Sequence, residues 1–270
     1  MKPILPFFAG LLLLTAPCGA QTLFFQAGAV ELADVIISGS NVQRKNGQGK
    51  PIPLAGVVRV DFPKSEDLAA ADELLLKGRY SEALAKAKVV QELHRPWKDK
   101  PGSFYAQASL LVAECLIRES KFDESARLMS ELRNRALPAN LQMRVTMLDS
   151  LEQLQKGITG PALAKVKPLA RTGQDADTLA RLYLLIGDIQ FKRDAFGEAL
   201  EAYLQIPVFY GAEAAFLPAA ELGAARSLAR LNRLADAGES LTRIIERYAG
   251  TQEAEAAKAE KAALAKLTGG

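Results

Sequence analysis

Small residues recur at two phased positions five times along this chain, and no other sequence feature constrains the fold as strongly. The downstream positions are separated by 42, 37, 37 and 38 residues and are occupied by Ala83, Ser125, Ala162, Ala199 and Ala237. Twelve residues before each lies a second small residue, in order Ala71, Ala113, Ser150, Gly187 and Ala225. A period in the thirties with two small positions per unit predicts stacked pairs of helices that cross at those residues.

The turn between the two helices of each unit is marked by a third position. Three residues before each downstream small residue stands a mostly bulky or branched side chain: Tyr80, Phe122, Thr159, Phe196 and Leu234. From residue 64 the composition is also rich in Ala, Leu, Glu, Lys and Arg, which have high helix propensity. We therefore expect helix pairs at 65–77 with 81–93, 103–119 with 123–135, 138–156 with 160–171, 176–193 with 196–206, and 214–231 with 235–248.

A final helix is expected near 252–267, within a C-terminal segment that we assign to 251–270. Its Ala-rich core and alternating charges suit a capping helix with one wet face, which a helical array needs at its end. A frayed helical tail is the alternative interpretation.

Residues 21–63 differ from the rest of the chain in their composition and in the pattern of their apolar residues. Short β-branched runs alternate with turns that contain Gly, Asn and Pro, which predicts a small β-module of three or four strands. Asn46-Gly47 indicates a hairpin turn between strands near 42–45 and 52–54, and a further strand is expected over 57–62. At about 40 residues this module is too small to be stable alone, so we expect it to dock on the first helices.

The first twenty residues are typical of a cleaved secretory signal. They contain one Lys, an apolar run over 4–14 and a small residue at Ala20. An uncleaved anchor is the competing interpretation, but the run is shorter than a spanning helix requires and prolines interrupt it. The segment predicts export, with a periplasmic location. Pro17 stands before Cys18, where a lipoprotein signal would need a small residue, so we do not expect lipidation.

Charge and cysteine content exclude several classes of function. The formal net charge is +3, and it falls to +2 when Lys2 leaves with the signal. Without a basic block, there is no reason to expect binding to nucleic acid or to an anionic membrane surface. Cys18 also leaves, so Cys115 is the one thiol of the mature chain and no intrachain disulfide can form.

In the fourth unit the pattern resembles a tetratricopeptide repeat (TPR). The family's aromatic, small and bulky positions match Tyr183, Ile186, Gly187, Ala199 and Tyr203. The resemblance extends over about 64–250, and the fifth unit is similar to repeats of secreted bacterial members, loosely including outer-membrane assembly lipoproteins and Tol-Pal-associated periplasmic proteins. It implies an α-solenoid of about five TPR-like helical hairpins plus a capping helix, preceded by the β-module.

In that family the first helices of successive pairs line a concave groove that binds a partner. Transferring the register to this chain places eight candidate groove residues: Gln107, Glu114, Arg144, Arg181, Leu184, Asp188, Phe191 and Arg226. Arg144, Arg181 and Arg226 would then form a ladder for a carboxylate or an acidic peptide segment, with Leu184 and Phe191 as an apolar anchor. The alternative is that these arginines pair with neighbouring acids on a solvated face.

The loop over 94–103 adds the extra length of the first interval and holds the chain's only His and only Trp. An insertion with an exposed aromatic often marks a contact loop, so Trp97 is a candidate contact residue. The alternative is that Trp97 packs over the joint between the first two units.

Catalytic and metal-binding motifs find little support. His94 has no His or Cys partner at metal-ligand spacing, and no Gly-x-Ser-x-Gly or phosphate-binding glycine loop occurs. The sequence thus predicts no catalytic residue, no cofactor and no metal. The function we expect is a non-catalytic protein-interaction scaffold of the cell envelope, with an exposed β-edge as a possible second docking element. Two alternatives stay open: a structural homo-oligomer assembled through the β-module, and a cell-wall hydrolase with paired carboxylates.

Overall fold

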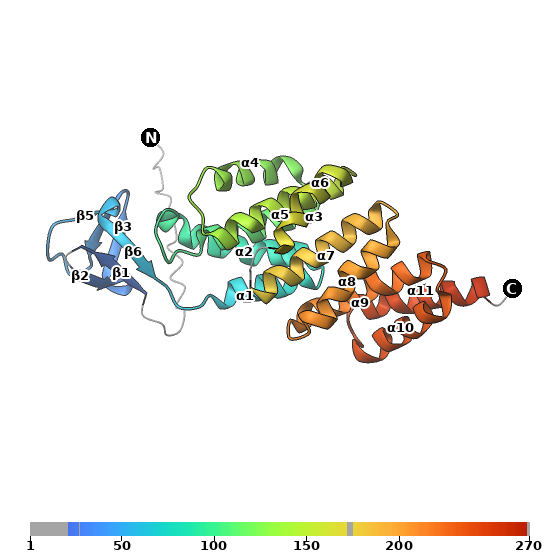
Figure 1. Ribbon diagram of the computed structural model, residues 1–270. Helices are drawn as coiled ribbons and strands as arrows, with labels where there is room; N and C mark the ends of the chain where they lie inside the picture. Colours follow the sequence, from blue (N-terminus) through green and yellow to red (C-terminus); the bar gives the residue numbers. More distant parts are fainter. Residues whose placement is uncertain (1–20, 27, 172–174, 269–270) are drawn as a thin grey trace, which may run out of the picture. The chain divides into compact units, whose positions relative to one another are not determined.

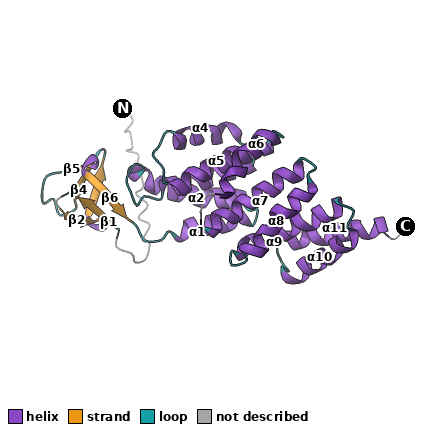
Figure 2. Ribbon diagram, viewed as in Figure 1, coloured by secondary structure: helices purple, strands orange, loops and turns teal. Residues whose placement is uncertain are grey.

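The computed structural model describes residues 21–26, 28–171 and 175–268, so the expected signal segment lies outside the described residues. The described chain is mainly helical and has a small region of β-strands at its N-terminal end (Figures 1 and 2). It divides into two compact units. One contains the strands up to Lys64 together with Asp99–Ser103, and the other contains Ser65–Lys98 and everything from Phe104 onward.

The β-unit contains two antiparallel three-stranded sheets. One sheet has the order β2-β1-β6 and the other β3-β4-β5. The strands are β1 Thr22–Phe25, β2 Gly28–Glu31, β3 Val35–Ser38, β4 Asn41–Arg44, β5 Ile52–Pro53 and β6 Val57–Asp61. Leu23, Val35, Val42, Val57 and Val60 supply the buried apolar side chains of this unit.

The predicted hairpin is confirmed, since β4 pairs with β5 in a register that sets Val42 opposite Ile52. The expectation of three or four strands was wrong for the described part, which has six. Two short 3₁₀ turns, Leu32–Asp34 and Leu54–Gly56, divide the β-branched runs into shorter strands than the sequence suggests. Asp99–Ser103 extends this unit, because the Val60 N–H donates to the Pro101 carbonyl at 3.0 Å. Part of the β6 edge is therefore occupied by the chain itself.

Eleven α-helices are present in the described residues, close to the expected ranges. They are α1 Glu66–Leu76, α2 Tyr80–His94, α3 Tyr105–Arg118, α4 Phe122–Arg133, α5 Ala139–Gln155, α6 Thr159–Val166, α7 Ala176–Lys192, α8 Phe196–Phe209, α9 Leu217–Arg230, α10 Leu234–Arg247 and α11 Gln252–Thr268. The second helix of every pair begins at the bulky or branched residue that the sequence marks as the turn.

Prolines explain where the bounds differ from expectation. Helix α6 ends at Val166 and continues as the 3₁₀ turn Lys167–Arg171, because Pro168 has no N–H with which to continue the helical hydrogen bonds. Helix α9 starts at Leu217 after the turn Ala214–Phe216, with a proline in its first turn. Helix α8 runs past Pro207 to Phe209, and the Tyr210 N–H still donates to the Ile206 carbonyl at 2.9 Å.

All ten phased small residues are buried, as helix crossings require. Gly187 shows the reason most clearly, because a Cβ there would lie 2.5 Å from Cε1 of Tyr203 on α8. At these positions a larger side chain would separate the two helices.

Each helix pair is joined by a turn whose key residue has a left-handed backbone. The five residues are Gly78 (φ 71°), Ser120 (φ 60°), Gly157 (φ 77°), Asp194 (φ 59°) and Asn232 (φ 59°). Each lies five residues before the downstream small residue, so the turns repeat with the same period. In every turn the next residue's N–H donates back to a carbonyl in the last turn of the first helix, as the Arg79 N–H does to Leu74 at 2.9 Å.

The first helices of the pairs contact one another in succession, α1 with α3, α3 with α5, α5 with α7 and α7 with α9, and α9 also contacts the final helix α11. The largest core cluster lies between α3 and α8, where Leu110, Met129, Leu182 and Ile189 are fully buried. Helix α11 covers the end of the fifth pair, because Ala257 packs in one cluster with Leu222, Leu241 and Ile244.

Candidate functional site

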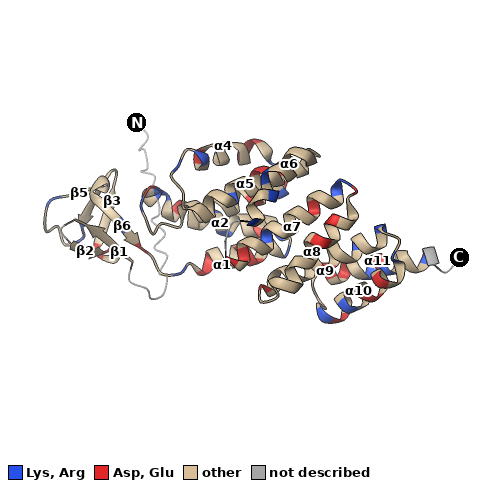
Figure 3. Cartoon of the chain, viewed as in Figure 1, with Lys and Arg blue, Asp and Glu red and all other residues tan. Residues whose placement is uncertain are grey.

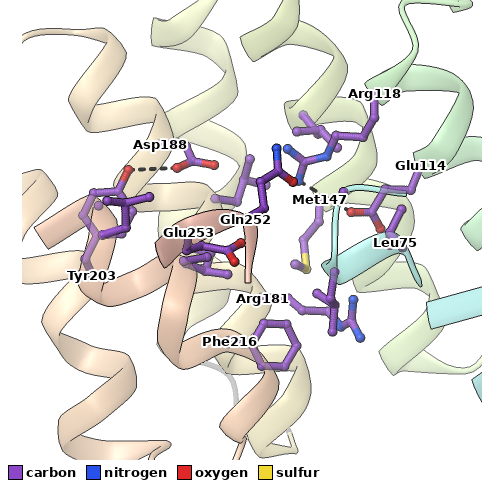
Figure 4. Close-up of a pocket in the computed structure, with 18 of the residues that line it drawn as sticks. Leu75, Glu114, Arg118, Met147, Arg181, Asp188, Tyr203, Phe216, Gln252 and Glu253 are labelled. Atoms are coloured by element: carbon purple, nitrogen blue, oxygen red, sulfur yellow. Dashed lines mark hydrogen bonds and ion pairs between the residues drawn. The ribbon is translucent and has the colours of Figure 1, made fainter. Parts of the chain in front are cut away.

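A pocket of about 360 Å³ lies on the face formed by the first helices of the pairs. Helices α1, α3, α5, α7, α9 and α11 all contribute to its lining, and Tyr203 of α8 and Phe216 add to it. In the view of Figure 4, Asp188 and Tyr203 lie on one side of the pocket and Glu114 and Arg118 on the other, with Gln252 and Glu253 between them. Its size is typical of a ligand site.

Apolar side chains make up a large part of the lining. Leu75, Met147, Leu148, Leu151, Leu185, Phe216 and Leu222 are all buried and all line the pocket. A ligand that entered would therefore exchange water for an apolar wall, which favours a partner with apolar side chains.

Two arginines share one carboxylate in the pocket. Glu114 Oε1 lies 3.7 Å from Arg118 Nη2, and Glu114 Oε2 lies 3.5 Å from Arg144 Nη2. Both distances exceed good hydrogen-bond length, and the buried Nη2 of Arg144 has no hydrogen-bond partner. Two positive charges facing one negative charge leave this cluster, the Glu114 cluster, with a net charge of +1 and an unused donor.

Asp188 and Tyr203 form a second polar pair in the lining. The Tyr203 hydroxyl donates to Asp188 Oδ1 at 2.8 Å. Burial raises the pKa of the Asp188 carboxyl, and Arg118, the Tyr203 hydroxyl and Arg226 only partly offset this effect. The pKa of Tyr203 is also raised, first by burial and then by the Asp188 charge.

Arg181 does not fit the predicted ladder of ligand-binding arginines. Its guanidinium is buried and pairs with both Asp72 of α1 and Asp177 of its own helix, the latter at 2.8 Å. Burial alone would lower the pKa of Arg181, but the two carboxylates outweigh it and the net shift is upward. The interpretation in which arginines pair with neighbouring acids therefore holds at this position.

Arg226 is also paired, although it is exposed. Its Nη2 lies 2.6 Å from Glu260 of α11. Of the predicted groove residues, Glu114, Arg144, Arg181, Leu184, Asp188 and Arg226 line the pocket.

Gln107 and Phe191 do not belong to the pocket lining. Phe191 stacks edge-on against Phe196 at 5.2 Å and faces the Arg230 guanidinium, so it serves packing at the end of its own pair. Gln107 lies near the start of α3 and, like Phe191, outside the pocket lining, so the expected contact of these two residues with a partner stays a prediction.

Trp97 is 1% exposed, so it presents no aromatic surface to a partner. The contact-loop interpretation is wrong at this residue, and the packing alternative agrees with its burial. His94 is buried in the same segment, where its Nδ1 accepts the Phe104 N–H at 3.3 Å. Burial lowers the pKa of His94 to about 4.

Sequence reasoning missed several lining residues: Leu75, Arg118, Tyr203, Phe216, Gln252 and Glu253. Arg118 was detectable, because it stands one helical turn after Glu114 and so shares its face. The lining residues on α1, α11 and the turn before α9 carry no such signal, because their place at the pocket depends on how successive helix pairs pack in three dimensions.

Three further kinds of feature bear on function in the described residues: metal sites, reactive nucleophiles and membrane-spanning helices. No group of three His, Cys, Asp or Glu side chains there could hold a metal ion. The buried Cys115 thiol has its pKa raised to about 12, first by burial, so it is not a reactive nucleophile. Within residues 21–26, 28–171 and 175–268, no helix has both the length and the apolar content that a bilayer crossing demands.

No model of a known protein family matches the chain, and a search of curated proteins finds no significantly similar sequence.

Proposed function

We propose that the helical unit is a TPR-like α-solenoid of five hairpins with a capping helix, and that it is a non-catalytic scaffold that holds a segment of a protein partner in the pocket. The observation that carries this proposal is one pocket lined by the first helix of every pair. The shared period of buried small residues and left-handed turns supports the solenoid, because it gives each pair the same internal geometry.

The lining indicates the chemistry of the partner segment. The Glu114 cluster offers the unpartnered Arg144 Nη2 in an environment with a net charge of +1. Leucines and Phe216 surround it. A segment with one acidic group and apolar neighbours complements both features, because a carboxylate can accept two charge-assisted hydrogen bonds from arginines.

The experiment is capture of partners from the native cell envelope with a photo-crosslinking amino acid at Met147, which lines the pocket. The test variant carries Arg118→Gln and Arg144→Gln. The matched control carries Arg127→Gln and Arg243→Gln, which are exposed residues on the second helices α4 and α10. We expect one crosslinked partner segment, lost in the test variant and kept in the control. An equal yield from both variants would contradict binding through the pocket.

The proposed cellular location is the periplasm, after removal of residues 1–20 as a secretory signal. This rests on the apolar run over 4–14 and the small residue at Ala20. N-terminal sequencing of the protein from its native compartment should then begin at Gln21, whereas a chain that begins at Met1 would indicate an anchor.

A second candidate function is self-assembly through the β-module. Three large apolar side chains of that unit, Ile36, Ile52 and Val58, are exposed by 53%, 39% and 46%. Such exposure favours contact with another chain. Light scattering that shows a defined oligomer, lost when Ile36 and Val58 are replaced by Ser, would support this candidate over the pocket.

A further inference from the structure

The first and the last helix pairs of the helical unit touch each other. In a stacked array each pair is expected to contact only its neighbours in the sequence. Here Asp72 of α1 forms an ion pair with Arg181 of α7, a residue of the fourth pair. Helix α1 also contacts the 3₁₀ turn Ala214–Phe216, which precedes the fifth pair.

Two further contacts lie along the same line. Leu76 of α1 packs against the cluster that contains Ala180, Phe216 and Leu217. Gly78, in the turn after α1, lies directly against the side-chain amide of Gln252 on α11. We call these three contacts the seam: Asp72 with Arg181, Leu76 with Phe216, and Gly78 with Gln252.

The seam is also a wall of the pocket. Leu76, Gly78, Arg181, Phe216 and Gln252 all belong to the lining, and Figure 4 shows Arg181, Phe216 and Gln252 around the same space. One side of the half-open pocket that holds the Glu114 cluster is therefore formed by contacts between helices far apart in the sequence. If the seam parted, the pocket would widen into a groove.

The seam is built so that it can separate without stranding a charge. Arg181 keeps Asp177 of its own helix as a partner when Asp72 leaves. The side chain of Asp72 is 29% exposed, so water can solvate it at once, and its Oδ1 has no hydrogen-bond partner in the closed form. Leu76 is only partly buried and already meets solvent on one side, whereas Phe216 across the contact is covered in the closed form. By contrast, the contacts between neighbouring pairs bury whole rows of side chains.

We propose that the seam is a gate: the array opens between α1 and the α7–α11 side, admits the partner segment, and closes over it. The gate depends on the proposed function only for the identity of the segment that binds. The opening itself is a property of the free chain. The closed form is the major state and the open form a minor one that a bound segment would bias.

The test measures opening without a partner. A Met147→Cys reporter, in a background with Cys18→Ala and Cys115→Ala, places a thiol in the pocket lining. Its labelling rate by a thiol reagent reports how often the pocket opens. Leu76→Ala and Asp72→Asn each remove one seam contact, and neither residue is fully buried.

Matched controls come from the same helix. Leu68 is a partly buried leucine of α1 that packs against the core cluster of α1, α2 and α3, and Asp67 pairs with Lys86 of α2 rather than across the seam. We expect labelling to rise roughly tenfold in Leu76→Ala and roughly threefold to fivefold in Asp72→Asn. Leu68→Ala and Asp67→Asn should stay within about twofold of the parent if they leave the seam intact.

Equal rates in the seam and control variants would overturn the gate, because labelling would then report general loosening. A second measurement is independent of reporter chemistry: the distance between spin labels at Lys77 and Glu255, which lie on the two sides of the seam and are exposed. A long-distance population should grow in Leu76→Ala and not in Leu68→Ala, and a single unchanged distance would contradict the proposal. The labelling and distance measurements test the gate, and partner capture tests the proposed function. Either proposal can fail while the other holds, so the two are distinguishable.

Discussion

Tyr203 shows how a single side chain fixes the spacing of three helices. Its ring lies where a Cβ on either Gly187 of α7 or Gly223 of α9 would come within 2.5 or 2.6 Å of it. Its hydroxyl donates to Asp188, so the ring position and the pocket chemistry depend on each other. The two glycines are needed for the space they leave and not for backbone freedom, because both lie within regular helices.

Adding one methyl group on either side of this ring should therefore be costly. Gly187→Ala and Gly223→Ala are each expected to lower the free energy of unfolding by about 1–3 kcal/mol, although Ala has the higher helix propensity. Gly197→Ala is the control, because a Cβ at Gly197 meets nothing within 4 Å. Urea denaturation measures all three, and stabilisation of the Gly187 and Gly223 variants would show that the ring moves aside freely.

His94 makes stability depend on pH in the acid range. Its folded-state pKa of about 4 lies below the ordinary value of 6.5 because the ring is buried. The unfolded chain therefore takes up a proton below about pH 6.5 that the folded chain refuses until about pH 4. The stability due to neutral His94 is complete above that window and is lost as the pH falls through it.

We expect the protein to lose about 1–3 kcal/mol from this residue between pH 7 and pH 4. His94→Asn removes the titration while keeping an oxygen that can accept the Phe104 N–H. Denaturation curves at pH 7, 5.5 and 4 should show that the variant loses less stability than the parent on acidification. Parallel losses in both proteins would assign the acid sensitivity to other groups.

At the scale of the element, the turn inside each helix pair is the most regular feature of the fold. Gly occupies the left-handed position in the first and third pairs, and Ser120, Asp194 and Asn232 occupy it in the others. Asn and Asp tolerate this backbone better than other residues with a Cβ, and Ser has less to offset the strain. The second pair thus has the most strained of the five turns.

Ser120→Gly should stabilise the protein by about 0.5–1 kcal/mol, because glycine adopts φ 60° without steric cost. Ser130→Gly, at an exposed position inside α4, is the matched control and should destabilise by about 0.5 kcal/mol. Thermal denaturation of both variants measures the contrast. A loss of stability in Ser120→Gly would mean that the hydroxyl has a role in the turn.

Most of the helical elements could be predicted because their signals are local. The phased small residues located both helices of each pair, and the expected starts of the second helices agree with the structure to within one residue. The turns that repeat before them went unnoticed, because Gly, Ser, Asp and Asn share a backbone conformation and not a side-chain class. The strand count failed for a related reason, since short 3₁₀ turns between β-branched residues have no strong composition.

The candidate site was predictable only where one helix determines it. Glu114, Arg144 and Asp188 follow from the inward face of their own helices, and they do line the pocket. The pairing of Arg181 with Asp72 joins residues 109 positions apart, and local periodicity holds no trace of it. The role of Trp97 could not be decided from the sequence, because an aromatic residue in an insertion gives the same sequence pattern whether its side chain is buried or exposed.

At the scale of the whole molecule, positive and negative residues nearly balance, with 34 Lys and Arg against 31 Asp and Glu. Figure 3 shows basic and acidic residues interspersed along the helices, in agreement with a formal net charge of +3. Binding selectivity then has to come from local groups such as the Glu114 cluster rather than from a long-range field. The seam is a non-local feature of the helical unit. It joins the first helix pair to the last ones, so that contacts in this unit are not limited to pairs adjacent in the sequence.

Helix α11 is where capping and pocket formation meet. It covers Leu222, Leu241 and Ile244, and its residues Gln252, Glu253 and Ala256 line the pocket. A chain that ends at Gly250 would expose that cluster and lose the Gln252 side of the seam. In an array of neighbours the damage should be greatest in the fifth pair and fade toward the second.

Hydrogen exchange of the chain that ends at Gly250 should therefore show the largest increase in α9 and α10 and little change in α4 and α6. Helix α1 is the informative exception: although it is farthest in sequence from the deletion, its exchange should rise because the seam is weakened. The control is Gln252→Ala, which removes the seam contact but leaves the cap in place, and should affect α1 more than α10. An α1 that keeps its full protection in both variants would show that the array is held by its neighbours alone.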